Sequence, residues 1–459
     1  RQGEQMLFHQ RGSHNGTYLI DHRQVKKIAL ERDGKPASFV YPYWHPSGRY
    51  VAFSTNETHQ DFHLSDENRI EVYDVESDVL IYDTEKERVF SSPLLASMAC
   101  YETFPTFTPD GNYLLFCSAD SVCMPENYRD VRYNLLRVAF DPKDGSIGTQ
   151  VDTLYNAREA GRSVKFPRVS PDGKRLLYTV SDYGNFSIWH KDADLHMLDL
   201  STGAIDSLPE VNSPDVESYH SWSGNSRWFV FSSRRGDGLF TRPYLVHVDE
   251  RGQCGKPFLL PQASPDYYER SLFSFNVPEF IRTPVLISKE RLVEASGKEE
   301  VTTIKLKTMR KVHLISVTEP LVLDLALALR EKGYEVSASG CGLTEEMIGR
   351  LHNAGCTCYG DGWFPEKLIK DIHSVVLGAK VKQDNPELLR AKELGMLIQS
   401  IPEFIFQRTR SKTRVVVAGS RGKKTIISMM VCALRRQKLA LDYALTSKVD
   451  SLPNRIHLS

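Results

Sequence analysis

The most regular feature of the sequence is a phrase that recurs four times in the first three fifths of the chain. Each copy begins with aromatic or apolar residues, continues with Pro-Asp-Gly or a variant, and ends in a short apolar run. The copies are residues 41–54, 104–117, 166–179 and 219–232. Proline presets the first φ of a tight turn, while aspartate and glycine supply a side-chain hydrogen bond and a positive φ. Each copy therefore predicts strand, turn, strand, and later alternating segments such as residues 194–200 complete a four-stranded sheet.

The copies recur at intervals of roughly 50–65 residues, longer than the roughly 40–50 residues of a four-stranded propeller blade, so we expect the excess in loops. The Pro-Asp-Gly phrase with its apolar strand resembles the TolB-type (PD40) repeat of periplasmic β-propellers. The resemblance covers residues 1–281 and implies an incomplete all-β propeller, with a partial first blade and about four more. The resemblance also implies that this region binds a protein or a ligand in the cell envelope. The chain begins at Arg1 inside a strand pattern, so we expect it to start partway through a blade.

One hydrophobic position repeats in every copy. It is occupied by Trp44, Phe107, Val169 and Trp222. We expect these side chains to pack between blades, and the alternative is a ring of residues that stacks on a ligand. No Ser-His-Asp order and no carboxylate pair stands out in this region, so we assign no catalytic residue to it.

A candidate metal cluster occurs in one lengthened loop, where His59 and His63 lie near Asp61 and Asp66. No helix pattern places both histidines on one face, so we expect solvated polar residues here. The cysteines include no CxxC pair of the kind that binds zinc. We therefore predict no metal site.

The pattern changes after a polar stretch at residues 282–309, which we interpret as a linker. Short apolar runs then alternate with helical patterns. We expect strands at residues 311–317, 335–339, 374–377 and 396–399, and helices at residues 321–332, 345–354 and 385–394. This alternation predicts a doubly wound parallel sheet, and so an α/β Rossmann-like domain at residues 310–411.

A candidate phosphate-binding loop follows. Residues 414–418 read as a buried strand, residues 419–425 as a glycine-rich turn and residues 426–437 as a helix. Backbone N–H groups in such a turn face phosphate oxygens, and the helix N-terminus adds partial positive charge. The candidate ATP phosphate-binding residues are Gly419, Ser420, Gly422, Lys423, Lys424 and Thr425. Residues 412–459 thus read as the start of a P-loop domain.

Several segments of this half resemble the Mur ligases. They are residues 332–336, 362–367, 384–389, 391–395 and 402–404. The nearest type is the murein-peptide-recycling enzyme, which joins a peptide to UDP-N-acetylmuramate. The resemblance implies a UDP-sugar domain at residues 310–411, with Ser316 and Thr318 at the sugar nucleotide, and a truncated ATP-binding domain. It also implies ATP and magnesium as cofactors, and a carboxylate activated as an acyl phosphate for attack by an amine.

Two departures from that family fall on the phosphate-binding turns. Glu319 would repel a pyrophosphate at a helix N-terminus, and Pro320 removes an N–H donor there. Lys424 stands where a hydroxyl would bind magnesium. Two hypotheses follow. The first is an envelope-type propeller scaffold joined to an inactive ligase-like region, and the alternative is an active ATP-dependent UDP-N-acetylmuramate peptide ligase. No catalytic residue is assigned in either case.

The amino-acid composition argues against some classes of binding partner. The 459 residues contain 58 Lys plus Arg and 58 Asp plus Glu, so there is no strongly basic field for nucleic acid. No apolar run approaches the roughly 18 residues of a membrane span. The two halves imply conflicting locations, because such propellers work in the envelope whereas ATP and UDP-sugars are cytoplasmic. Met309 lies where a ligase-like domain would begin, so we interpret the chain as a fused or fragmentary product.

Overall fold

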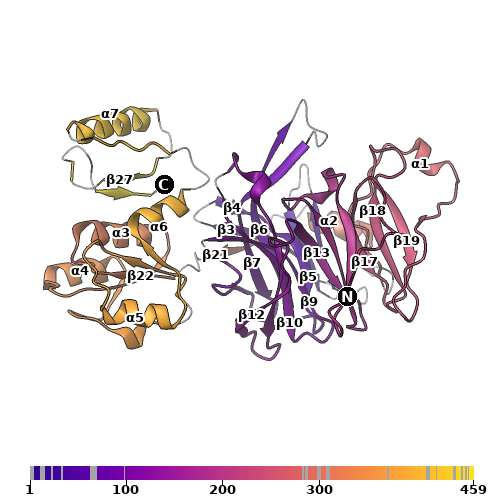
Figure 1. Ribbon diagram of the computed structural model, residues 1–459, viewed down its shortest axis with the longest axis horizontal. Helices are drawn as coiled ribbons and strands as arrows, with labels where there is room; N and C mark the ends of the chain where they lie inside the picture. The colour runs from indigo at the N-terminus through magenta and orange to yellow at the C-terminus, as the bar shows by residue number, and fades with distance from the viewer. Residues whose placement is uncertain are drawn as a thin grey trace. The chain divides into compact units, whose positions relative to one another are not determined.

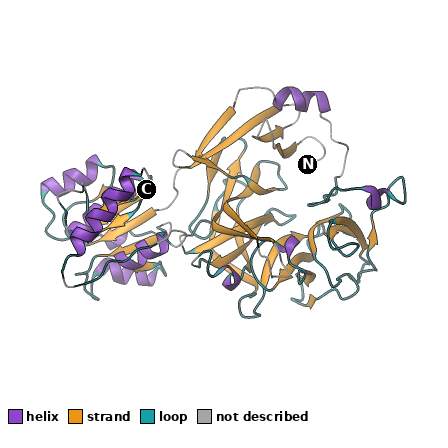
Figure 2. Ribbon diagram, turned by 90° about the horizontal axis from the view of Figure 1, so that it is seen from above, coloured by secondary structure: helices purple, strands orange, loops and turns teal. Residues whose placement is uncertain are grey.

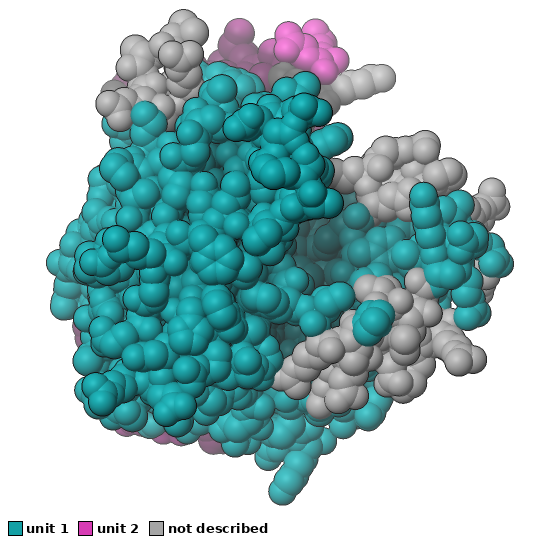
Figure 3. Space-filling model, turned by 90° about the vertical axis from the view of Figure 1, so that its right-hand side faces the viewer, with its two compact units in different colours: residues 1–31, 35–305 teal, residues 32–34, 306–459 magenta. Residues whose placement is uncertain are grey.

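The structure is a computed structural model, and it falls into two compact units (Figure 3). It describes residues 5–10, 16–21, 24–32, 35–62, 70–97, 99–122, 124–281, 284, 288–296, 301–306, 311–369, 372–409, 414–419, 421–437, 441–445, 448, 449, 452 and 454–458. Unit 1 contains residues 1–31 and 35–305, and unit 2 contains residues 32–34 and 306–459. Strands predominate in the first, and helices flank the sheet of the second (Figure 2).

Unit 1 is built from five sheets that follow one another along the chain (Figure 1). Sheet 1 contains β1 (Gln5–Gln10), β2 (Gly16–Asp21), β3 (Gln24–Arg32), β4 (Lys35–Ala37) and β21 (Val301–Leu306). Sheet 2 contains β5 (Val40–Trp44), β6 (Tyr50–Phe62), β7 (Ile70–Asp83) and β8 (Arg88–Phe90). Sheet 3 contains β9 (Cys100–Phe107), β10 (Tyr113–Asp120), β11 (Asn134–Phe140) and β12 (Ile147–Tyr155). Sheets 2 to 5 are antiparallel, with four strands in sequence order.

Sheet 4 contains β13 (Ser163–Val169), β14 (Arg175–Ser181), β15 (Asp194–Asp199) and β16 (Ile205–Asp206). Sheet 5 contains β17 (Glu217–Trp222), β18 (Trp228–Ser233), β19 (Arg242–His247) and β20 (Phe258–Leu259). Between and after the sheets lie the short helices η1 (Tyr128–Asp130), η2 (Ser187–Trp189), α1 (Tyr267–Arg270) and α2 (Lys289–Ser296).

The recurring turn joins the first two strands of sheets 2 to 5, as predicted. The fourth residue of the turn is left-handed in every copy, with φ of 81° at Gly48, 77° at Gly111, 75° at Gly173 and 59° at Ser226. Its N–H donates to the carbonyl three residues earlier, at 2.8–3.0 Å. The fourth copy has lost the proline and the aspartate, yet Asn225 Oδ1 still accepts from the Arg227 N–H at 3.1 Å. The turn therefore survives the change of sequence.

The first strand of each of these sheets carries a bulge with an aromatic residue in the left-handed region. These residues, which we call the bulge aromatics, are Tyr41, Phe104, Phe166 and Tyr219, with φ of 51°, 53°, 50° and 48°. The pairing register shifts around each of them. Their ring centroids lie 4.5 Å apart for Tyr41 and Phe104, 4.1 Å for Phe104 and Phe166, and 4.6 Å for Phe166 and Tyr219. One ring from each sheet thus contacts a ring of the next.

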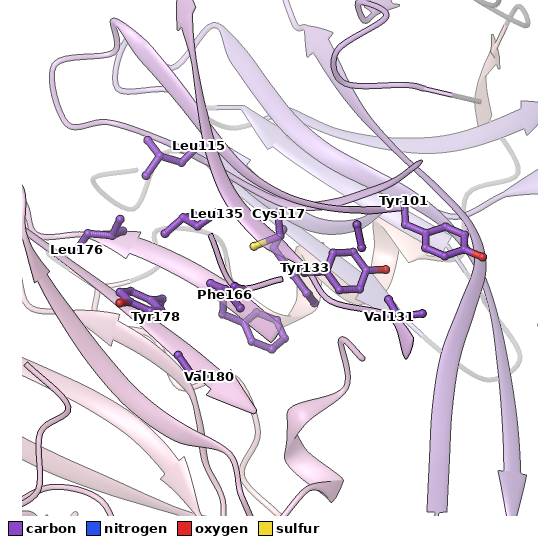
Figure 4. Packing of buried hydrophobic residues seen from close by; sticks show 14 of the residues in the cluster. Tyr101, Leu115, Cys117, Val131, Tyr133, Leu135, Phe166, Leu176, Tyr178 and Val180 are labelled. Carbon is purple, nitrogen blue, oxygen red and sulfur yellow. The ribbon is translucent and has the colours of Figure 1, made fainter. Parts of the chain in front are cut away.

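Successive sheets pack face to face. In β10, Leu114 and Phe116 join the cluster shared with sheet 2, whereas Leu115 and Cys117 join the cluster shared with sheet 4. Figure 4 shows the second cluster, where Tyr178 of β14 is among the residues on the opposing side. Alternate side chains of a strand point to opposite faces. Both faces are therefore buried, which explains why the strands after the turns are continuously apolar.

The repeated hydrophobic position behaves largely as predicted. Phe107, Val169 and Trp222 are buried, while Trp44 is half-buried. The Trp222 Nε1–H donates to the Arg168 carbonyl of the neighbouring sheet at 3.0 Å. Phe107, Val169 and Trp222 each belong to a buried cluster shared by neighbouring sheets.

Two stretches differ from the sequence-based expectation. The expected linker, residues 282–309, contains α2 and β21, and β21 pairs with β3 of sheet 1. Ile304 and Leu306 are buried, and the strand falls in unit 1 up to residue 305. The expected polar loop around His59 is instead a long hairpin formed by β6 and β7, with His59 paired opposite Tyr73. His63 and Asp66 lie outside the described residues.

Unit 2 contains the doubly wound sheet that the sequence predicted. The strands are β24 (Thr357–Cys358), β23 (Glu335–Ser339), β22 (Lys311–Ile315), β25 (Ser374–Leu377) and β26 (Ile398–Ser400), in this spatial order and all parallel. The helices are α3 (Pro320–Glu331), α4 (Glu345–Asn353), η3 (Pro365–Lys367), α5 (Pro386–Glu393), α6 (Ile401–Arg408) and α7 (Lys423–Arg436). A short hairpin, β27 (Tyr443–Ala444) and β28 (Ile456–His457), follows. The chain order reverses between β22 and β25, which makes this point the topological switch of the sheet.

One predicted strand is wrong. Residues 414–418 form no strand, and the side chains of Val415 and Val416 are 65% and 88% exposed. An apolar run becomes a buried parallel strand only when neighbouring strands pair with it. No described strand pairs with this segment.

The contacts of the bulge aromatics predict how a substitution changes the free energy of unfolding. Phe104 is 1% exposed and contacts the rings of both Tyr41 and Phe166, so Phe104→Ala should lower the free energy of unfolding of unit 1 by about 3–5 kcal/mol. Urea unfolding of the full chain measures the loss. The matched control is Phe62→Ala, because Phe62 is 73% exposed at the end of β6. Equal effects of the two substitutions would contradict the role of the bulge aromatics.

Candidate functional site

The carboxyl ends of β22 and β25 meet at the topological switch point, where ligands of open α/β sheets bind. Residues 316–319 follow β22, and residues 378–380 follow β25. The predicted sugar-nucleotide residues Ser316 and Thr318 lie in the first of these turns. Ser316 is buried and Thr318 is half-buried. The structure thus places both predicted residues at the crevice.

Three backbone N–H groups of the turn after β22 donate to carbonyl groups of the protein itself. The N–H groups of Ser316 and Val317 both donate to the Ser339 carbonyl, at 3.0 and 2.9 Å. The Glu319 N–H donates to the Ser316 carbonyl at 3.0 Å, and Ser316 is left-handed with φ of 75°. A phosphate-binding turn needs its N–H groups directed at the ligand. These three donors are already used.

Glu319 lies at the N-cap of α3, but its side chain does not cap that helix. Its carboxylate instead accepts from two consecutive backbone N–H groups after β25. The distances are 3.1 Å from Ala379 N to Oε2 and 2.9 Å from Lys380 N to Oε1. A negative charge of the protein itself therefore occupies the crevice between the two turns. The sequence predicted that Glu319 would repel phosphate, and the structure adds where its carboxylate binds.

The second predicted site is the loop before α7. Gly422 is the N-cap of α7 and has φ of 78°, so the helix begins at Lys423 rather than at Ile426. The Lys423 ammonium group donates to the Gly419 carbonyl, which folds the side chain back on its own loop. Lys424 and Thr425 are exposed, and Ser420 lies outside the described residues. The turn and the helix form as predicted, but without the preceding strand.

A buried polar network at the centre of unit 2 was missed by sequence analysis. Glu387 of α5 is fully buried, and its Oε2 lies 3.3 Å from His313 Nε2 and accepts from the Ser339 hydroxyl. Its Oε1 accepts from the Phe364 N–H at 2.7 Å. Burial alone would raise the pKa of Glu387, but these hydrogen bonds outweigh it and hold the pKa below its usual range. Ser339 Oγ also lies 3.4 Å from His313 Nε2, so the three side chains form one buried hydrogen-bonded cluster.

A second buried network lies in unit 1, between sheet 2 and the loop that contains η2. The Asp74 carboxylate accepts from Asn56 and Thr58, each at 2.6 Å, and from Asn185. Burial raises the pKa of Asp74 to about 6, against the lowering effect of these donors. Nearby, Glu71 Oε2 accepts from the Tyr183 hydroxyl at 2.8 Å. The network links the hairpin of β6 and β7 to the loop that contains η2.

A lysine is buried close to this network. The Lys165 ammonium group contacts the Ser181 hydroxyl and donates to the Tyr183 carbonyl at 3.1 Å. Burial lowers the pKa of Lys165 to about 7. Sequence patterns gave no signal for either network, because their members lie on separate strands and loops. In the described part of the chain no set of three or more His, Cys, Asp or Glu side chains could hold a metal ion.

The comparisons with known proteins concern a minority of the chain. No family model matches the sequence. The UDP-N-acetylmuramate–L-alanine ligase of Carboxydothermus hydrogenoformans is 36% identical over 133 residues, covering 29% of this chain and 28% of the ligase. The ligase of the same name from Persephonella marina is 37% identical over 124 residues, covering 27% and 26%. The chain thus spans little more than a quarter of the length of the curated relatives it matches.

Solved structures align with low scores. The UDP-N-acetylmuramate:L-alanyl-gamma-D-glutamyl-meso-diaminopimelate ligase from Neisseria meningitides gives a TM-score of 0.30 at 23% identity, over 33% of this chain and 47% of that chain. Dipeptidyl peptidase 4 from Porphyromonas gingivalis gives 0.29 at 9% identity, over 94% and 81%. Scores this low carry no argument. The sequence similarity confirms the resemblance to Mur ligases for about a quarter of the chain, while the recycling subtype and the TolB-type repeat stay predictions.

The Glu387 network predicts a pH dependence. A carboxyl whose folded-state pKa lies below its unfolded value of about 4.3 stabilises the protein above that pH, and the contribution is lost as pH falls through the folded-state pKa. Glu387→Gln should therefore destabilise unit 2 by about 1.5–3 kcal/mol at pH 7, and by less near pH 3. Hydrogen exchange in β22 and β23, followed by mass spectrometry, reports on this unit.

The matched control is Glu393→Gln, on the same helix, because the Glu393 side chain is 65% exposed in its pair with Arg390. It should leave exchange unchanged at both pH values. A Glu387→Gln effect of the same size at pH 3 and pH 7 would contradict the lowered pKa.

Proposed function

We propose that unit 2 is a non-catalytic domain related to UDP-N-acetylmuramate ligases, and that unit 1 is a propeller-type binding scaffold of the cell envelope. The observation that carries the first part is the Glu319 carboxylate bound at the switch-point crevice by Ala379 N and Lys380 N. The sequence similarity to the ligases, over up to 133 residues, supports the relationship. The domain keeps the ligase-like sheet, but three backbone N–H groups of its first turn already donate to carbonyl groups of the protein.

The residues of the second loop do not fit magnesium-bound ATP. The family's cofactors would be held by the turn from Gly419 to Thr425, with a hydroxyl at the magnesium position. Lys424 occupies the position of that hydroxyl, and a protonated amine has no lone pair for a metal ion. The Lys423 ammonium, which would meet phosphate oxygens, is bound to the Gly419 carbonyl. We therefore assign no catalytic step and no catalytic residue to unit 2.

The scaffold role of unit 1 is supported by how its buried histidines are used. His45 Nε2 contacts the Gly111 carbonyl at 3.0 Å, and His220 Nε2 contacts the Leu177 carbonyl at 3.0 Å. Burial lowers the pKa of His220 to about 3, so it stays neutral at physiological pH. These two side chains link neighbouring sheets, whereas the Nε2 of a third buried histidine, His190, lies 3.4 Å from Glu71 Oε1. In the described residues no helix has the length and apolar character to cross a membrane.

The lost magnesium ligand gives a direct test. Lys424→Thr returns a hydroxyl oxygen to the first turn of α7, so it should make ATP binding magnesium-dependent and about ten- to a hundredfold tighter than in the wild type. Calorimetric titration of the full chain with ATP, with and without magnesium, measures the change. Lys424→Ala is the control, because it removes the same positive charge without supplying a metal ligand.

Equal ATP affinity in Lys424→Ala and Lys424→Thr would show that charge alone matters. Micromolar binding of ATP and UDP-N-acetylmuramate by the wild type, with ADP formed when an amino acid or peptide is added, would establish the alternative, an ATP-dependent peptide ligase.

Unit 1 is tested separately. The full chain should show no turnover of peptide, ester or lactone substrates, because a scaffold has no nucleophile and base to activate. Turnover in this assay that a single substitution in unit 1 abolishes would contradict the scaffold role.

A further inference from the structure

We propose that Ala379 and Lys380 form a backbone anion site, and that this chain fills it with its own Glu319 carboxylate in place of a phosphate-bearing ligand. The inference rests on the proposed function only for the class of ligand. The site itself stands on the contacts around β25.

The two donors come from consecutive residues after β25. The Gly378 N–H donates to the Ile315 carbonyl at 2.9 Å, which turns the chain at the end of the strand. The next two N–H groups then reach one carboxylate, at 3.1 and 2.9 Å. Consecutive N–H groups that converge on one anion form a concave binding site for carboxylate or phosphate oxygens. Ala379 and Lys380 are both exposed to solvent.

Gly378 fits the close approach of the carboxylate. A Cβ at this position would overlap Glu319 Oε1 and lie 3.0 Å from Ser316 Cβ. Gly378 does not have a left-handed φ, so its backbone conformation does not require glycine. The absent side chain is what leaves room for an oxyanion against the backbone. The space beside Gly378 thus holds the same carboxylate that accepts from Ala379 N and Lys380 N.

The position of the Glu319 carboxylate explains why it would exclude a phosphate group. Glu319 comes from the turn after β22 and its two donors come from the turn after β25, so its side chain spans the switch point. A phosphate or pyrophosphate group entering between the turns would need the same N–H groups and would meet a like charge. Removing the carboxylate frees both donors and removes the repulsion together.

The test uses inorganic pyrophosphate as the probe and the full chain as the protein. Glu319→Ala should bind pyrophosphate at least tenfold more tightly than the wild type in calorimetry. The matched control is Glu331→Ala, which removes the same charge from the other end of α3, where Glu331 is exposed. In the Glu319→Ala protein, pyrophosphate should also shift the amide resonances of Ala379 and Lys380.

Glu319→Gln guards against misfolding of the alanine variant, because its amide oxygen can still accept from both N–H groups. It should give a smaller gain, still larger than that of Glu331→Ala. Equal affinities in the Glu319 and Glu331 variants, or amide resonances of Ala379 and Lys380 that do not move, would overturn the inference.

A second probe separates this inference from the proposed function. If Glu319→Ala binds pyrophosphate and binds UDP-N-acetylmuramate more tightly still, both are supported. If it binds pyrophosphate but has no added affinity for UDP-N-acetylmuramate, the anion site stands and the ligand class drawn from the ligases is wrong.

Discussion

The fold of unit 1 depends on contacts among the bulge aromatics. Each of these residues adopts a left-handed backbone, which costs of order 1–3 kcal/mol for a bulky side chain. In exchange, its ring is brought against the ring of the next sheet, at centroid distances of 4.1–4.6 Å. Burial of such a ring contributes about 1.5–3 kcal/mol, and each aromatic pair about 0.5–1.5 kcal/mol more. The contacts between successive sheets are therefore large enough to offset the strain.

The residue after each bulge contributes to the same arrangement. Proline follows Tyr41, Phe104 and Phe166, and it has no N–H that a bulge would leave unpaired. Where the fourth copy has His220 instead, the imidazole reaches the Leu177 carbonyl of the preceding sheet. In β17, His220 and Trp222 thus add hydrogen bonds with the preceding sheet to the contact between rings. The strands β7 and β13, which carry Asp74 and Lys165, belong to this arrangement.

Turns and strands that depend on a few neighbouring residues could be predicted from the sequence. Strands that depend on pairing with a distant segment could not. The Pro-Asp-Gly turns and the strands β23 and β25 could be located from the sequence, because turn chemistry and strand periodicity act over a few residues. The strand β21 was missed because its partner β3 lies far away in sequence. The opposite error occurred at residues 414–418, where an apolar run has no described partner. In the site, the charge of Glu319 was evident, but not that Ala379 and Lys380 would bind it.

In both ligase-like loops, a charged side chain of the protein binds backbone groups of the loop or of a neighbouring turn. At the first, a carboxylate of the protein binds the backbone donors of Ala379 and Lys380, and at the second, the Lys423 ammonium binds the Gly419 carbonyl. A ligand would have to break these contacts before making its own. Each charge-assisted hydrogen bond contributes about 1.5–3 kcal/mol, so each such contact lowers ligand affinity by about ten- to a hundredfold. In both loops, polar groups that would contact a ligand are thus satisfied within the protein.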